Sequence, residues 1–201
     1  MDSAYEIKRD QIKKTAIRIF ARYGYHKSTL DDIANSIGMK KNSLYYYFPN
    51  KEELFNELIQ DEFEIFFKEI DKLIAARTNT TQKVKSILKK LITHSKERSS
   101  LYSTTFEVYL EIGEVVEKSH KEHRNVITEK LAVILKDGIK NGELKKHNSN
   151  ELAEYLINIT SSLAYKEIRK SDIQSFDQID YSSIERTTSK IVDYVIDGLK
   201  C

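Results

Sequence analysis

Apolar side chains recur every three or four residues along almost the whole chain, and this period is the strongest constraint on the fold. The segment 6–23 is typical, with Ile12, Ala16 and Ile19 separated mainly by polar and charged residues. Such a period places the apolar residues on one face of an α-helix, whereas a half-buried strand alternates every second residue. The 201 residues include only 6 glycines and 1 proline, too few for the frequent turns of an all-β fold. The sequence therefore predicts an all-α protein.

Capping patterns and glycines divide the chain into about nine helices. Thr29 followed by Asp32 and Asn50 followed by Glu53 are capping patterns that mark helix starts. Gly24 and Gly38 mark helix ends, and we expect a break near Gly113 as well. The expected helices cover about residues 6–23, 29–37, 41–48, 51–76, 80–92, 101–112, 117–139, 149–168 and 184–199. Three short helices would form an N-terminal head, and six longer ones would form a body.

Charge is distributed unevenly between this head and this body. Residues 1–51 carry ten basic and five acidic side chains, which leaves +5 there and about −3 in the remainder of a chain whose net charge is +2. A basic head on a mildly acidic body suits a protein that binds a polyanion at one end. Uneven charge is common, however, so a solvated surface is the alternative interpretation.

The expected helices 29–37 and 41–48 have the spacing of a helix-turn-helix. In such a unit the second helix enters the major groove of DNA, roughly 12 Å wide, while the first braces it. Ala34 is small where the two helices would cross, and Ile33, Ile37, Leu44 and Phe48 would bury the inner face. The other residues of the second helix would be divided between base edges, phosphates and the core: Lys40, Lys41, Asn42, Ser43, Tyr45, Tyr46 and Tyr47. An ordinary corner of an α-bundle, with the tyrosines as packing, is the alternative.

Five short motifs in this region occur in a characteristic order: IFARYGY at 19–25, STLDDIA at 28–34, IGM at 37–39, SLYYYF at 43–48 and NKEEL at 50–54. In order and spacing, residues 7–67 resemble the tetracycline-repressor (TetR) family of bacterial regulators. Farther along, Gly138, Gly142 and the Glu143-Leu144 pair are similar to part of that family's C-terminal domain. Elsewhere in the body the resemblance is weak.

The resemblance implies a DNA-binding transcriptional regulator. Residues 1–50 would be the helix-turn-helix DNA-binding domain, and residues 51–201 the ligand-binding and dimerisation domain. The partners would be double-stranded operator DNA, a second copy of the chain and a small effector. The family pattern further implies a repressor that the effector releases from its operator.

By position in the family motif, Ser28 and Thr29 begin the first helix of the unit, and Thr29 would contact a phosphate. Tyr45 and Lys51 would contact phosphates as well. The positions that contact bases or the groove are Lys41, Asn42 and Tyr47, with Tyr46 at a flanking position.

Two positions depart from the family pattern. Lys40 stands where the family usually has a small hydroxyl residue, and Asn42 stands where it often has Gly, Pro or Ala. Lys40 cannot cap the helix, so either the turn is less rigid or Asn42 caps and shortens the helix. Asn42 can also pair with adenine through two hydrogen bonds, which discriminates between bases by about 1–3 kcal/mol.

The body offers a candidate effector pocket and a candidate dimer interface. Aromatic residues behind the head would line the pocket and favour an apolar or aromatic effector: Phe63, Phe66, Phe67, Tyr102, Phe106, Tyr109 and Tyr155. Plain core packing is the alternative for each of them. Small polar residues at 158–162 suit either a pocket or close packing between subunits, and we favour the latter. The expected interface residues are Leu156, Leu163, Ile191, Val195 and Leu199.

The sequence displays no catalytic motif. It lacks a nucleophile elbow, a phosphate-binding glycine loop and a metalloprotease histidine pair, so an all-α enzyme is only the alternative function. His120 and His123 share a helix face near Glu117, but an exposed polar stretch is the favoured interpretation over a metal site. We expect no cofactor and no metal.

The expected location is the cytoplasm. Cys201 is the single cysteine, so the chain cannot form an intrachain disulfide. No apolar run approaches the 18 or so residues of a membrane span, and the N-terminal sequence does not resemble a signal peptide.

Overall fold

The computed structural model describes residues 3–101, 106–170 and 178–201, and the regular elements within these ranges are eight α-helices. The all-α class is therefore confirmed. The helices are α1 (Ser3–Tyr23), α2 (Leu30–Ser36), α3 (Lys41–Tyr45), α4 (Lys51–Ala75), α5 (Thr80–Leu101), α6 (Phe106–Lys140), α7 (Ser149–Ile168) and α8 (Tyr181–Leu199).

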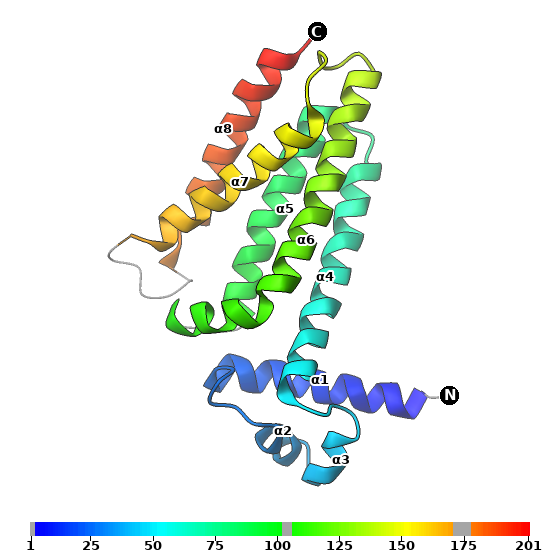
Figure 1. Ribbon diagram of the computed structural model, residues 1–201, viewed down its shortest axis with the longest axis vertical. Helices are drawn as coiled ribbons and strands as arrows, with labels where there is room; N and C mark the ends of the chain where they lie inside the picture. The colour runs from blue at the N-terminus through cyan, green and yellow to red at the C-terminus, as the bar shows by residue number, and fades with distance from the viewer. Residues whose placement is uncertain (1–2, 102–105, 171–177) are drawn as a thin grey trace.

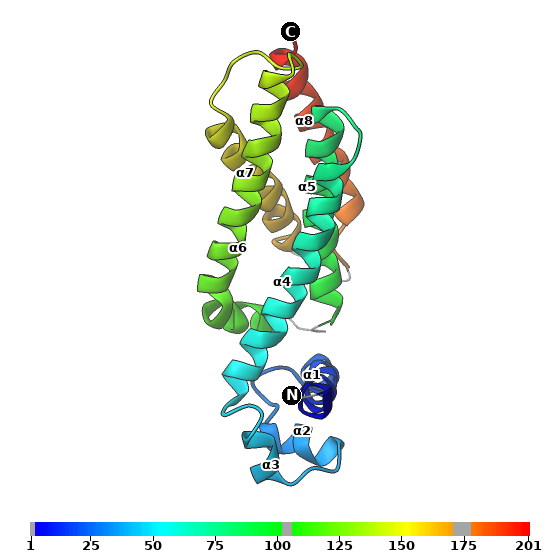
Figure 2. The same ribbon diagram turned by 90° about the vertical axis from the view of Figure 1, so that its right-hand side faces the viewer.

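The molecule is elongated, with α1, α2 and α3 at one end and α5 to α8 at the other (Figure 1). The long helix α4 joins the two ends, because its first turns contact α1 and its later turns contact α5 and α6. Figure 2 shows the same arrangement from the side, with α1 seen nearly end-on beneath the bundle. Any displacement of α4 therefore involves both ends of the molecule.

One continuous apolar core runs through α4 from the small N-terminal unit into the body. At the N-terminal end it contains Ile12 and Phe20 of α1 packed with Phe55 of α4, and it continues to Ile70 of α4 and Leu131 of α6. A smaller second cluster lies between α5 and the start of α8, where Ile92 packs with Tyr181 and Ile184. Because α4 shares its core with both ends, burial of apolar surface holds the N-terminal unit against it.

Local signals account for the helix ends around α2. Thr29 caps α2 through a capping box: its hydroxyl accepts a hydrogen bond from the Asp32 N–H at 3.2 Å, and its own N–H donates to the Asp32 carboxylate at 2.8 Å. Gly24 and Gly38 have φ angles of 81° and 66°, a left-handed conformation that glycine adopts without strain. The predicted cap at Asn50 is also confirmed, because its side chain accepts from the Glu53 N–H at 2.7 Å.

Four predicted boundaries were wrong. α5 continues to Leu101, well beyond the expected end at residue 92. α6 continues through Gly113, so one helix replaces the two expected there; a single glycine weakens a helix by only about 1 kcal/mol. α3 ends at Tyr45, because Tyr47 and Phe48 donate their N–H groups to the Leu44 carbonyl in a tighter turn. α8 begins at Tyr181 rather than 184, where the Asp180 side chain caps it by accepting from the Ser183 N–H.

In the described ranges, no helix combines the length and the apolar character that crossing a membrane requires.

Candidate nucleic-acid interface

The helices α2 and α3 pack against each other as a compact corner. Ile33, Ala34 and Leu44 are buried between them, and Phe48 closes the far side of the same core. The Met39 N–H donates to the Ala34 carbonyl at 2.8 Å, which fixes the turn that contains Gly38. The inner face predicted from the sequence is thus confirmed, with Ile37 only partly buried.

The outer face of α3 is polar, basic and exposed. Lys40, Lys41, Asn42 and Ser43 are all exposed. Lys40 is the N-cap residue of α3 but makes no side-chain capping hydrogen bond, so the alternative in which Asn42 caps the helix was wrong. The amide of Asn42 is therefore available to another molecule.

An ion pair fixes the base of this face to α2. The Lys41 ammonium lies 2.8 Å from the Asp31 carboxylate, and the same ammonium lies 5.8 Å from the centre of the Tyr45 ring. Hydrogen bonding to Asp31 raises the pKa of Lys41, so the lysine stays cationic. Tyr45 is partly covered by this contact, whereas 73% of Tyr46 is exposed.

Two residues predicted to contact DNA instead face the protein. Ser28 is only 2% exposed, and its hydroxyl donates to the Gly24 carbonyl at 2.6 Å, because it closes the loop between α1 and α2. Tyr47 is half-buried and stacks on Tyr5 of α1, with ring centres 4.9 Å apart. Ser28 thus faces the interior and Tyr47 packs on α1, and a DNA contact by either residue stays a prediction.

Lys51, the first residue of α4, also turns toward the protein. Its ammonium donates to the carbonyls of Tyr25 at 2.7 Å and Ser28 at 2.9 Å, and it lies 4.2 Å from the centre of the Tyr25 ring. Burial lowers the pKa of this ammonium, and the carbonyl dipoles and ring face supply the negative charge density that surrounds it. Lys51 thus ties the start of α4 to the loop before α2, rather than standing free for a phosphate.

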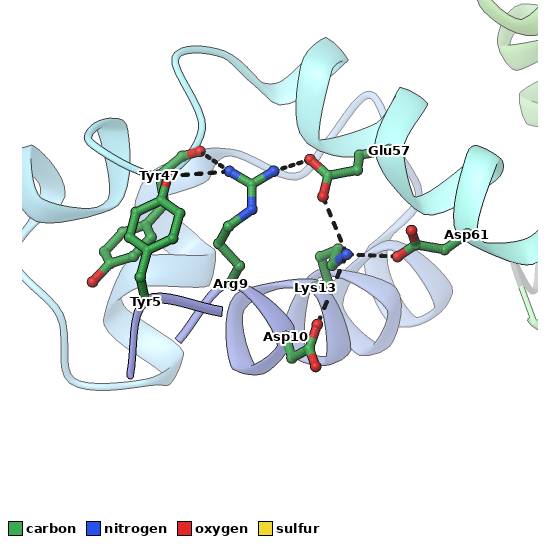
Figure 3. Close-up of polar contacts among 7 residues, drawn as sticks. All are labelled: Tyr5, Arg9, Asp10, Lys13, Tyr47, Glu57 and Asp61. Carbon is green, nitrogen blue, oxygen red and sulfur yellow. Dashed lines mark hydrogen bonds and ion pairs between the residues drawn. The ribbon is translucent and has the colours of Figure 1, made fainter. Parts of the chain in front are cut away.

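A network of charged side chains joins α1 to α4 (Figure 3). The Arg9 guanidinium bonds to the Glu57 carboxylate and donates to the Tyr47 carbonyl at 2.8 Å. The Lys13 ammonium lies 3.1 Å from the other Glu57 oxygen and 2.6 Å from Asp61. Because the Tyr47 carbonyl follows α3 directly, the network fixes the position of α3 relative to both α1 and α4.

The network is partly buried, which strengthens each charge contact. Burial raises the pKa of Glu57, but the hydrogen bonds from Arg9 and Lys13 outweigh that effect and hold the pKa below its usual value. For Lys13, burial lowers the pKa, and the bonds to Asp61 and Glu57 raise it overall. Glu57 and Lys13 are therefore both charged near neutral pH.

The network was not predicted from the sequence. A signal was present, because Arg9 and Lys13 are four residues apart on α1, and Glu57 and Asp61 are four residues apart on α4. Each pair lies on one face of its helix, with opposite charge to the other pair. Only the packing of α1 against α4 shows that the two faces meet.

Three of the predicted pocket residues do lie together. Phe63, Phe66 and Phe67 pack together on α4, and two histidine rings contact them. The centre of the His94 ring from α5 lies 4.3 Å from the centre of the Phe66 ring, and the ring of His123 from α6 stacks on that of Phe63. The aromatic cluster is thus Phe63, Phe66, Phe67, His94 and His123.

Both histidines are buried, and one is paired with a carboxylate. His94 Nε2 lies 3.1 Å from Glu62 Oε1, a distance typical of a hydrogen bond, but the directions of the two groups do not satisfy hydrogen-bond geometry. The expectation that His123 belongs to an exposed polar stretch was wrong, because its ring is covered by Phe63 and Phe67. No group of three or more possible metal ligands occurs among the described residues.

The other four residues predicted for the pocket are not part of this cluster as the structure describes it. Tyr155 is exposed on the outer side of α7, where its hydroxyl donates to Glu151 at 2.7 Å, so its assignment to the pocket is contradicted. Tyr102 lies outside the described residues. The side chains of Phe106 and Tyr109 lie outside the described part as well, although their backbone belongs to α6.

Exposed apolar side chains occur on both of the two last helices. Tyr155 and Ile159 of α7 and Tyr194 of α8 are exposed, and Ile191 of α8 is half-buried. We call these four residues the α7–α8 face.

The predicted interface residues only partly coincide with this face. Leu156 is 2% exposed and packs in the core of its own subunit, so a partner could not contact it and that prediction was wrong. Leu163 and Leu199 are half-buried against the second cluster and the main core, respectively. Ile191 and Val195 keep partial exposure.

Two family models match the chain. The model described as "Bacterial regulatory proteins, tetR family" matches residues 12–58, from α1 into α4. The model described as "Tetracyclin repressor-like, C-terminal domain" matches residues 80–170, from α5 to the end of α7. Together the two matches cover more than half of the chain.

Individual proteins show the same similarity. The biofilm operon icaADBC HTH-type negative transcriptional regulator IcaR of Staphylococcus epidermidis is 43% identical over 58 residues, 29% of this chain and 31% of that protein. The fatty acid metabolism regulator protein of Bacillus subtilis is 26% identical over 151 residues, 73% of this chain and 76% of that protein. The match to the first thus spans about a third of that protein, and the match to the second includes most of the body.

A solved structure is also similar over nearly its whole length. A transcriptional regulator from Cytophaga hutchinsonii superposes with a TM-score of 0.81 and 29% identity, covering 96% of this chain and 99% of that one.

Proposed function

Because this chain belongs to the tetR family of bacterial regulatory proteins, which are DNA-binding transcriptional regulators rather than enzymes, we propose that it represses transcription as a homodimer bound to operator DNA. Residues 1–50 are the DNA-binding domain in this proposal, and residues 51–201 bind the effector and the second subunit. The observation that carries the proposal is the exposed basic and polar face of α3, from Lys40 to Tyr46.

The residues on this face have different roles in the proposal. Lys40 and Tyr45 contact phosphates. These contacts contribute affinity but do not distinguish one base sequence from another. Asn42 and Ser43 reach base edges in the major groove, and Lys41 contacts DNA with the donors that Asp31 leaves free. Thr29 contacts a phosphate from the start of α2, and Tyr46 extends along the groove.

Two copies of α3 must be held one helical turn of DNA apart, roughly 34–36 Å. We propose that the α7–α8 face pairs with the same face of the second copy, because its exposed apolar side chains lose contact with water in the dimer. An effector that binds more tightly to a dimer whose two α3 helices are differently spaced shifts the population toward that dimer. The operator is then released.

We propose that the effector is small and apolar or aromatic, and that it binds beside the aromatic cluster. The rings of Phe63, Phe66 and Phe67 offer apolar contacts, and the pair formed by His94 and Glu62 offers a polar group at the same place. α4 carries these phenylalanines and also begins beside α3, so a shift of α4 at the cluster is transmitted to the DNA-binding end.

The DNA-binding proposal is tested by measuring affinity for the protein's own upstream region at several salt concentrations. We expect binding that is tighter than to random duplex and that falls steeply with salt. Asn42→Ala should change which operator variants are preferred, whereas Asn150→Ala, an exposed asparagine on α7, should not. Equal affinity of the wild type for random and upstream DNA at every salt concentration would contradict the proposal.

The effector proposal is tested with the flat aromatic dye 1-anilinonaphthalene-8-sulfonate. We expect saturable dye fluorescence, displacement of operator DNA at the same dye concentrations, and weakening of both by Phe67→Ser. Val133→Ser, which alters an exposed apolar residue on α6 outside the cluster, is the matched control. If both variants bind the dye like the wild type, the effector does not bind at the aromatic cluster.

A further inference from the structure

Three tyrosine rings attach the end of α3 to α1. Tyr5, the third residue of α1, stacks on Tyr47, with ring centres 4.9 Å apart and ring planes 25° apart. The ring of Tyr46 meets both of the others edge-on, with its centre 5.9 Å from that of Tyr5 and 5.3 Å from that of Tyr47. Stacked and edge-on arrangements are both favourable for aromatic pairs. We call Tyr5, Tyr46 and Tyr47 the tyrosine cluster.

A guanidinium group of α1 supports this cluster (Figure 3). Arg9, one helical turn after Tyr5, donates to the Tyr47 carbonyl at 2.8 Å and to the Tyr5 hydroxyl at 3.4 Å. The same guanidinium lies 4.4 Å from the centre of the buried Phe48 ring. The first turns of α1 therefore hold the residues that follow α3 through their rings and through their main chain.

α3 depends on such outside contacts for its orientation. It has five residues, far fewer than a helix that is stable alone, and Lys40 supplies no side-chain cap from the described part of the chain. The pair of Lys41 with Asp31 fixes its start to α2, and Leu44 is buried beneath it. Because five residues span only about 7.5 Å, a displacement of the end of α3 reorients the whole face that carries Asn42.

We infer that Tyr5 is a positioning residue for operator recognition, because its stacking on Tyr47 fixes the angle at which α3 enters the major groove. This inference rests on the proposed operator binding by α3. The cluster also supports the ring of Tyr46 from two sides, although 73% of that residue is exposed. α1 thus contributes to the choice of operator sequence through residues other than its basic ones.

Base contacts and phosphate contacts should respond differently to the loss of this stacking. Hydrogen bonds to base edges carry the sequence information and weaken steeply when their angle is wrong. Tyr5→Ala should therefore reduce affinity for the operator more than affinity for random duplex. The contribution of a stacked aromatic pair corresponds to about two- to tenfold in this ratio for each subunit. The dependence of affinity on salt should stay the same, because no cation is removed.

The experiment is titration of the full chain with its upstream region and with random duplex, at several salt concentrations. Tyr5→Phe should keep the wild-type ratio of the two affinities, because it retains the ring and loses only the long 3.4 Å contact of the hydroxyl. Tyr23→Ala is the matched control, because it removes an exposed tyrosine at the other end of α1. This control should bind both duplexes like the wild type.

Amide hydrogen exchange of the protein without DNA provides a second readout. The N–H groups of Tyr47 and Phe48 donate to the Leu44 carbonyl at the end of α3. In Tyr5→Ala we expect these two amides to exchange faster than in the wild type, whereas amides within α2 and α4 should keep their wild-type rates. A general loss of stability would instead accelerate exchange in all three helices.

Two results would overturn the inference. The first is a Tyr5→Ala variant that distinguishes the upstream region from random duplex as well as the wild type does. The second is exchange at Tyr47 and Phe48 that is unchanged, or that rises no more than exchange in α2 and α4. A wild type that does not distinguish the two duplexes contradicts the DNA-binding proposal instead. The exchange measurement uses no DNA, so the two failures are distinguishable.

Discussion

Lys40 and Lys51 each lie where a helix begins, yet their surroundings differ completely. Lys40 is exposed before α3, whereas the Lys51 ammonium donates to main-chain carbonyls of Tyr25 and Ser28. The family pattern implies that Lys51 contacts a phosphate directly. The contacts of its ammonium indicate that it acts by positioning the start of α4 against the loop before α2.

Salt dependence separates these two roles. Lys40→Met should leave stability unchanged and reduce the slope of log affinity against log salt by about 0.9 for each subunit, because one phosphate contact is lost. Lys51→Met should leave the slope unchanged and lower the free energy of unfolding by about 1–3 kcal/mol, because its carbonyl partners lose a charged donor. Binding titrations at several salt concentrations and urea unfolding measure both quantities. A reduced slope for Lys51→Met would show that its ammonium leaves the carbonyls and binds phosphate.

At the residue scale, sequence reasoning succeeded where the partners are close in the chain. The Thr29 cap depends on Asp32 three residues later, so a local pattern was enough to predict it. The burial of Ser28 and the contacts of Lys51 depend on residues that meet only after α1, α2 and α4 have packed. No local pattern carries that information.

At the scale of elements, the network of Arg9, Lys13, Glu57 and Asp61 makes α1 and α4 one unit. Glu57→Gln removes the carboxylate that both cations share. We expect the free energy of unfolding to fall by about 1–2 kcal/mol, between the values for exposed and buried ion pairs. Operator affinity should fall as well, because Arg9 also holds the Tyr47 carbonyl beside α3.

The pH dependence of this effect has a definite direction. The pKa of Glu57 is lower in the folded protein than in the unfolded chain, so its contribution to stability is fully present above its unfolded pKa, about 4.3. That contribution disappears as the pH falls through the folded pKa. The difference in stability between wild type and Glu57→Gln should therefore be constant near neutral pH and vanish in acid.

Glu64→Gln is the matched control, because Glu64 is exposed on the same helix and, among the described residues, its ion-pair partner is Lys68 at 3.8 Å. Its unfolding curve should coincide with that of the wild type. Equal stabilities of Glu57→Gln and Glu64→Gln at neutral pH would mean that the network does not stabilise the junction of α1 and α4.

Helix positions were largely predictable, and helix continuity was less so. The period of apolar residues located α1, α2, α4 and α7 to within a few residues, because each helix buries one face. The helix end predicted at Gly113 was wrong, because a glycine that can end a helix can also lie within one. The packing of α1 against α4 was not predicted, since opposite charges on two helices do not show that the helices meet.

For the whole molecule, the proposed function depends on two subunits. Ile159→Glu places a charge in the α7–α8 face and should convert the dimer to a monomer, as measured by sedimentation. Operator affinity should then fall by about 100-fold or more, because one subunit can hold only half of the site. Helix content measured by circular dichroism should be unchanged, since Ile159 is already 38% exposed in the subunit.

Ile65→Glu tests whether any exposed isoleucine would give this result. Ile65 lies on α4, away from the α7–α8 face, and is 62% exposed. This variant should stay dimeric and bind the operator. A dimeric Ile159→Glu variant would show that the subunits associate through another surface.

In mechanical terms, α4 is a lever. Its 25 residues span about 37 Å at 1.5 Å per residue, with Lys51 at one end and the phenylalanines of the aromatic cluster at and just beyond its midpoint. A rotation of about 5° around the far end would displace the first residue by about 3 Å, more than the tolerance of a hydrogen bond to a base. A substitution that changes side-chain volume at Phe66 or Ile70 can therefore alter the spacing of operator half-sites that the protein prefers, although neither residue touches DNA.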